Sequence, residues 1–157
     1  MKKNILSTIS LSAFFAVAII ISSSIGDEGS YSVYANTSSS PGAKTASPAD
    51  GNTCTLCHTG SAVNSGPGTA SITAVGLSSG YIPGQTYTIT GSISQTSINK
   101  FGFEVTAERD LNNAKTGTFI ITNATTTQFP ITGSASVTHK SSGTSGAGGK
   151  SWSFDWT

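Results

Sequence analysis

Apolar and polar residues alternate in short runs over most of the second half of the chain. These runs cover residues 71–75, 87–93, 101–107, 117–121, 136–139 and 152–156. A period of two places the apolar side chains of a strand on one face. Glycine, proline and asparagine separate the runs and favour turns. The pattern predicts an all-β fold, an immunoglobulin-like sandwich of short antiparallel strands.

The last run carries the aromatic residues Trp152, Phe154 and Trp156 on one predicted face, and the sequence ends at Thr157. A strand of this kind normally pairs with a following strand. Without such a partner, its aromatic face would lie on an open sheet edge, which favours aggregation. We therefore expect a C-terminally incomplete domain, or self-association through a strand supplied by another chain.

The N-terminal residues 1–35 have the features of a signal peptide. Met1-Lys2-Lys3 is positively charged, a largely apolar stretch follows from Ile5 to Ile21, and small residues come next. The pattern predicts cleavage after Gly26 or Ala35, and export to the periplasm or the cell surface. The alternative is an uncleaved membrane anchor, because the apolar stretch is close to the shortest length that spans a bilayer.

Composition narrows the range of partners. The chain has 157 residues, a net charge of +1 and 10% charged residues, and its lysines and arginines are scattered. Nucleic-acid binding needs clustered basic residues, so we expect none. We expect membrane contact only through an uncleaved signal or a C-terminal anchor. Residues 36–53 contain the turn signals Pro41-Gly42 and Pro48 to Gly51, and we expect a flexible leading segment there.

A haem-attachment motif follows this segment. Cys54-Thr55-Leu56-Cys57-His58 is a C-x-x-C-H sequence, the pattern of c-type haem attachment. Two thiols at this spacing can reach the two vinyl groups on one edge of a porphyrin, and the adjacent imidazole can bind the iron. We predict one covalent haem c on Cys54 and Cys57, with His58 as the proximal ligand. Residues 54–157 would form the attachment loop and the β-sandwich.

Three other uses of the two cysteines stay open at this point. A thioredoxin-like redox pair would need a βαβ context, which the strand-rich pattern does not provide. Zinc needs four ligands, and Cys54, Cys57, His58 and His139 could supply them. A local disulfide is compatible with an oxidising compartment.

The sixth ligand of the iron is predicted by elimination. The only methionine is Met1, in the targeting segment, and the only other histidine is His139. Alternation places His139 on the same face as Val137, which favours an inward side chain. We therefore expect bis-His ligation by His58 and His139. The alternatives are a five-coordinate iron, or one capped by water or lysine.

The sequence around the motif resembles the bacterial choice-of-anchor V domain proteins, which are related in pattern to the reeler domain. The similar stretches are residues 45–60, 81–90, 101–107, 117–119, 137–140 and 151–156. The resemblance implies an exported or surface-displayed immunoglobulin-like sandwich, in which Cys54, Cys57, His58 and Thr138-His139 occupy the motif positions. Members usually continue past the final aromatic strand with further strands and an anchor.

Together these observations predict an exported monohaem c-type cytochrome domain that transfers electrons to redox partner proteins and is not an enzyme. The alternative from another class is a surface adhesion module without redox turnover, which the Ser- and Thr-rich strands favour. A haem enzyme or sensor would need an open iron site. The run Glu108-Arg109-Asp110 lacks the spaced carboxylates of a calcium loop, and we expect a solvated turn there.

Overall fold

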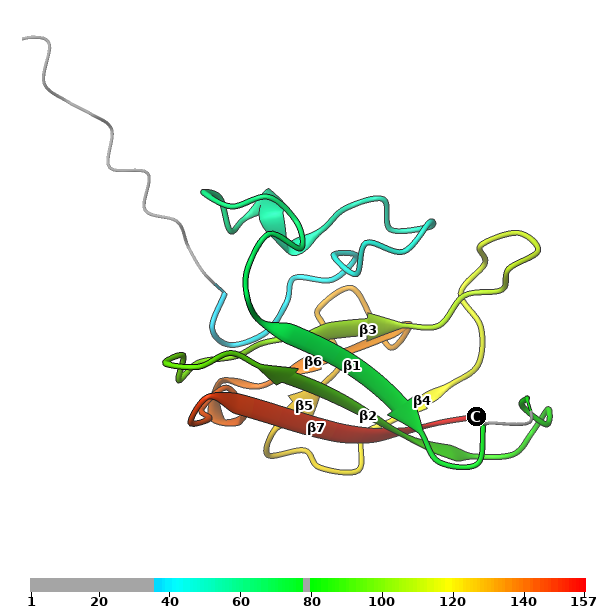
Figure 1. Cartoon of the computed structure of the whole chain (residues 1–157). Helices are drawn as coiled ribbons and strands as arrows, with labels where there is room; N and C mark the ends of the chain where they lie inside the picture. The colour runs from blue at the N-terminus through cyan, green and yellow to red at the C-terminus, as the bar shows by residue number, and fades with distance from the viewer. Residues whose placement is uncertain (1–35, 78–79) are drawn as a thin grey trace, which may run out of the picture. The chain divides into compact units, whose positions relative to one another are not determined.

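The structure is a computed structural model that describes residues 36–77 and 80–157 (Figure 1). The predicted signal peptide, residues 1–35, lies outside the described residues. The elements within the described part are η1 (Cys54–Leu56), β1 (Thr69–Ala74), β2 (Tyr87–Ser94), β3 (Glu104–Thr106), β4 (Phe119–Ile120), β5 (Thr127–Gln128), β6 (Ser136–His139), η2 (Ser141–Gly143) and β7 (Gly149–Trp156).

The strands form two antiparallel sheets, which confirms the predicted all-β class. One sheet has the order β1-β2-β7-β4 and the other has the order β3-β6-β5 (Figure 1). The longest pairing joins β2 and β7, from Tyr87 opposite Trp156 to Ser94 opposite Gly149. The register places apolar residues of both strands on one face, as their alternation predicts.

The inner faces of the two sheets share a single core. Its buried members come from β2, β4, β6 and β7, namely Tyr87, Ile89, Phe119, Val137 and Phe154. Phe154 is fully buried, and its ring stacks on Phe103 at 6.0 Å and meets Phe119 edge-on at 5.7 Å. These centroid distances are typical of favourable aromatic pairs. The core therefore joins the two sheets through aromatic side chains.

Strand β7 lies inside its sheet, so the prediction of an open aromatic edge is wrong. It pairs with β2 on one side and with β4 on the other. Trp152 is 2% exposed and Phe154 is 0% exposed. Strand order is set by long-range pairing, which the position of β7 in the sequence does not reveal. The outer strands are β1 and β4 in this sheet and β3 and β5 in the other, so strand-mediated self-association would have to use one of these four.

The leading segment, predicted to be flexible, is tied to the second sheet by hydrogen bonds. The backbone N–H of Ser40 donates to Oγ1 of Thr138 at 2.9 Å, and that of Lys44 donates to Oε2 of Glu104 at 3.2 Å. The side-chain amide of Gln128 donates to the carbonyl of Ser38 at 2.6 Å. These contacts fix the path of the leading segment before it reaches η1. No helix within residues 36–77 and 80–157 is long and apolar enough to cross a membrane.

Candidate functional site

The C-x-x-C-H motif folds as a single helical turn. Thr53 caps the turn, because its Oγ1 accepts the N–H of Thr55 at 3.2 Å. The N–H groups of Cys57 and His58 both donate to the carbonyl of Cys54, at 3.2 and 2.9 Å. In a 3₁₀ turn the side chains at positions i and i+3 lie one above the other. The turn holds the two cysteines three residues apart, and of the two only Cys54 lines the adjoining pocket.

A pocket of about 770 Å³ adjoins this turn. It lies between the loop around η1, strands β1 and β2, and the segment that leads into β3. Its size is within the range of small-molecule and cofactor sites. The lining residues include Lys44, Cys54, His58 and Val63 from the loops, Ile72, Gly91 and Ile93 from the first sheet, and Gly102, Phe103, Glu104 and Val105 around β3.

The apolar wall of this pocket is a continuation of the core. Ile72 pairs with Gly91, and Ala70 pairs with Ile93, on the inward face of β1 and β2. Ile72 is nevertheless 61% exposed. An inward-facing isoleucine with this exposure means that the space between the sheets is open beneath β1. A bound apolar group in this space would remove that surface from water, which is favourable.

The cysteines differ in their surroundings. Cys54 lines the pocket and donates its S–H to the carbonyl of Lys44 at 3.8 Å, whereas Cys57 is half-buried in the turn. Desolvation, followed by the negative charge of Glu104, raises the pKa of the Cys54 thiol. Redox-active cysteines of thioredoxin-like proteins have lowered pKa values. The environment of Cys54 therefore disfavours a thiolate-based redox pair.

Neither a disulfide between the two cysteines nor a zinc site is formed in the part of the chain that the structure describes. Among the residues that the structure describes, Cys54 and Cys57 are both free thiols. No group of three or more His, Cys, Asp or Glu side chains in that part of the chain is placed to hold a metal ion. The structure therefore brings Cys54 and His58 together at the pocket, but it does not gather the four candidate zinc ligands into one cluster.

His139 is buried at the end of β6, as are the other three residues of that strand, so its predicted inward placement stays a prediction. Its ring lies behind the pocket wall, next to Gly102 and Phe103. Nδ1 lies 3.1 Å from the backbone N of Phe103 and 3.2 Å from its carbonyl oxygen. Nε2 lies 3.4 Å from the carbonyl oxygen of Asn36. Ligation by His139 stays a prediction, since the ring is near the pocket without lining it.

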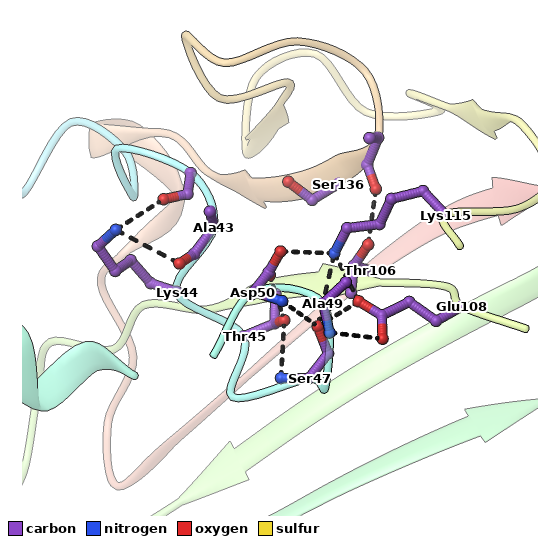
Figure 2. A network of polar contacts seen from close by, with 12 residues as sticks. Ala43, Lys44, Thr45, Ser47, Ala49, Asp50, Thr106, Glu108, Lys115 and Ser136 are labelled. Atoms are coloured by element: carbon purple, nitrogen blue, oxygen red, sulfur yellow. Dashed lines mark hydrogen bonds and ion pairs between the residues drawn. The ribbon is translucent and has the colours of Figure 1, made fainter. Parts of the chain in front are cut away.

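A network of charged residues holds the loop that precedes the motif (Figure 2). The ammonium group of Lys115 lies 2.6 Å from Asp50 and 2.8 Å from Glu108. Glu108 also accepts hydrogen bonds from the hydroxyl of Ser47 and the backbone N–H of Ala49. The network connects residues 47–50 to the hairpin between β3 and β4. The sequence predicts a solvated turn at Glu108 and gives no signal for these partners, which are distant along the chain.

The pKa values in this network shift in the directions that ion pairing produces. Desolvation opposes ionisation of Asp50 and Glu108, but their hydrogen bonds, above all those from Lys115, lower the pKa of both carboxyls. Desolvation likewise opposes the charged form of Lys115, while the two carboxylates raise its pKa. Lowered carboxyl pKa values stabilise the fold above their ordinary range, and this stabilisation is lost as the pH falls through the lowered values.

Replacing Lys115 by methionine is expected to reduce stability at pH 7 and to weaken its dependence on acid. In the native chain, the free energy of unfolding should fall as the pH drops from the ordinary carboxyl range of about 4 through the lowered pKa values of Asp50 and Glu108. The Lys115→Met variant should show a smaller fall, because its carboxyls have lost the cation. Urea unfolding at pH 7 and pH 3 measures both effects.

Lys100→Met is the matched control, since Lys100 donates to the neutral hydroxyl of Ser145. The loss at pH 7 should be modest, because partly exposed ion pairs contribute little. Equal acid dependence in the native chain and the Lys115→Met variant would contradict the role assigned to the network.

Comparison with known protein families, curated proteins and solved structures gives no match for this chain. The resemblance to choice-of-anchor V and reeler-like domains therefore stays a prediction from the residues. The site is interpreted from its own chemistry.

Proposed function

We propose that this chain is an exported monohaem c-type cytochrome domain that transfers electrons. Haem c would be attached through Cys54 and Cys57, with His58 as the proximal ligand. The observation that carries the proposal is the pocket beside the C-x-x-C-H turn. It has Cys54 and His58 in its lining, and its apolar wall includes the inward-facing but exposed Ile72.

The residues present fit a haem in three respects. The helical turn places the two cysteines three residues apart, the next residue is a histidine, and the adjoining wall is apolar. A covalently held haem would supply one-electron redox chemistry at its iron. Attachment outside the cytoplasm also agrees with the N-terminal pattern of a signal peptide. The reeler-like resemblance supports the same compartment and the same motif positions.

The protein residues of the pocket would set the environment of the haem. Ile72, Ile93, Phe103 and Val105 would exclude water from one face, and solvent access is a main determinant of redox potential. Glu104 places a carboxylate at the pocket. Its oxygens accept hydrogen bonds from Ser40, from Ser136 at 2.9 Å and from the backbone of Lys44. A negative charge here favours the oxidised, more positive iron, and so lowers the potential.

His139 is our proposed distal ligand, which would give bis-His ligation and saturate the iron. A saturated iron favours electron transfer over the activation of small molecules. The electrons would pass to redox partner proteins in the periplasm or at the cell surface.

Production of the full chain in a bacterium that matures c-type cytochromes tests the proposed function. The purified chain should give a pyridine haemochrome spectrum of haem c with one haem per chain, and the haem should resist extraction by acidified organic solvent. A colourless product from a host that loads a control cytochrome would refute the proposal.

A second candidate function, surface adhesion without redox turnover, is favoured by the outer face of the first sheet. Hydroxyl pairs cross its strands, with Thr90 2.9 Å from Ser153 and Ser92 2.8 Å from Ser151. Thr69 and Ser94 continue the row at 2.8 Å. A hydroxyl-rich face of this kind suits contact with other polar polymers. Adhesion of the colourless chain to cell-wall polysaccharide would support this candidate, whereas haem loading supports the first.

A further inference from the structure

Gly102 lies between the pocket and the imidazole ring of His139. Gly102 lines the pocket. A Cβ atom built on Gly102 would lie 2.7 Å from Cε1, 2.9 Å from Nδ1 and 3.3 Å from Nε2 of the His139 ring. Real Cβ atoms essentially never come within 3.0 Å of another heavy atom. The imidazole ring therefore occupies space that any side chain at position 102 would need.

The backbone conformation of Gly102 does not itself require glycine. Gly102 is not among the glycines of the described residues that have a positive φ, so its φ is one that other residues adopt. Its neighbours Phe101 and Phe103 are both large. The constraint at position 102 is consequently one of space, and the group that occupies this space is the His139 ring.

The hydrogen bonds of His139 fit two tautomers. When the proton is on Nε2, Nδ1 accepts the backbone N–H of Phe103 at 3.1 Å. Iron ligation requires the other tautomer, in which Nδ1 carries the proton and donates to the carbonyl of Phe103, which lies 3.2 Å away. The same carbonyl accepts the Thr138 hydroxyl at 2.8 Å, so its position is fixed. Metal-ligating histidines commonly donate their second ring N–H to a backbone carbonyl. Nε2 then has only the long 3.4 Å contact with Asn36, an exposed residue.

We propose that Gly102 is a positioning residue for haem ligation, because its missing side chain leaves the opening through which the His139 imidazole reaches the iron. This inference rests on the proposed function and adds to it. Phe103 would orient the ring through its backbone, and Gly102 would leave room for the ring at the pocket wall. A side chain at position 102 would push the ring away from the pocket while leaving the thioether attachment at Cys54 and Cys57 intact.

The first test compares Gly102→Ala, His139→Ala and Gly66→Ala with the native full-length chain. Gly66→Ala is the matched control. Gly66 is outside the pocket lining, has no positive φ, and a Cβ there would meet no heavy atom within 4 Å. All four proteins should contain covalent haem by the pyridine haemochrome assay. The native chain and Gly66→Ala should have low-spin ferric absorption spectra, whereas Gly102→Ala and His139→Ala should both be high-spin.

A second test serves if Gly102→Ala does not fold. The variant His139→Gly removes the ring, so adding Gly102→Ala to it creates no clash with the imidazole. Added imidazole should return His139→Gly to the low-spin state by filling the vacated space. The double variant His139→Gly/Gly102→Ala should bind imidazole about tenfold more weakly or worse, because the new methyl group occupies that space.

The outcomes separate this inference from the proposed function. A native chain without covalent haem refutes the proposed function and this inference with it. Covalent haem with a low-spin Gly102→Ala and a high-spin His139→Ala refutes the inference alone. A low-spin His139→Ala refutes the inference and also the assignment of His139 as distal ligand. Equal imidazole affinity in the single and double variants also refutes the inference. High-spin spectra in Gly102→Ala and His139→Ala, with a low-spin Gly66→Ala, support it.

Discussion

Replacing both Cys54 and Cys57 by serine is expected to abolish covalent haem attachment completely. A serine hydroxyl does not add to the vinyl groups of haem, so no thioether forms at either position. Each single variant should keep one thioether and give a lower yield. Its haemochrome band should move to longer wavelength, because one vinyl group stays conjugated with the ring.

Thr55→Ser is the control for the cysteine variants. Thr55 lies inside the same helical turn, and its exchange keeps a hydroxyl and both thiols. Haem staining after denaturing electrophoresis, with equal amounts of exported protein loaded, measures attachment. Undiminished staining of the Cys54→Ser/Cys57→Ser double variant would show that the haem is held elsewhere.

Replacing Phe154 by alanine is expected to cause the largest loss of stability. Phe154 is 0% exposed, and its ring contacts Phe103 and Phe119 from the two sides of the core. Truncation of a buried phenylalanine to alanine costs about 3–5 kcal/mol. Because a domain of this kind has a total stability of roughly 5–15 kcal/mol, the variant should be close to unfolding at room temperature.

Ser153→Ala provides the comparison within the same strand. Ser153 is exposed on the outer face of β7, where its hydroxyl lies 2.9 Å from that of Thr90. Its loss should change the free energy of unfolding by about 0.5 kcal/mol or less. Urea unfolding followed by tryptophan fluorescence measures both variants. A cost below about 1 kcal/mol for Phe154→Ala would contradict the assignment of Phe154 to the centre of the core.

Much of the fold could be predicted from the alternation of residues. The run over 136–139 matches β6, and those over 71–75, 87–93 and 152–156 match β1, β2 and β7 to within a few residues. Strand β5, Thr127–Gln128, is too short to show a period. Strand β3 is shorter than its run, because the N–H of Phe101 donates to the carbonyl of Thr144 outside the sheet.

The arrangement of the strands was harder to predict than their existence. The pairing of β7 with both β2 and β4 depends on residues far away in the chain. The burial of β6 on both faces has a similar origin. Val137 packs in the core, while Thr138 is covered by the leading segment through Ser40. Alternation alone could therefore not establish which face of His139 would be covered.

The candidate site likewise combines features that are local in the sequence with features that distant segments create. The spacing of Cys54, Cys57 and His58 is local, and so is the helical turn, which Thr53 caps. The pocket is not local, since its walls come from β1, β2 and the chain around β3. The closeness of Gly102 to His139 and the pairing of Lys115 with Asp50 likewise arise only when distant segments meet.

Mass spectrometry of the purified, exported chain tests the central claim most directly. We predict that the proteolytic peptide containing Cys54-Thr55-Leu56-Cys57-His58 carries the mass of one haem, and that both thiols resist alkylation after reduction. A peptide of unmodified mass whose two cysteines are both alkylated, from a host that loads a control cytochrome, would contradict the account.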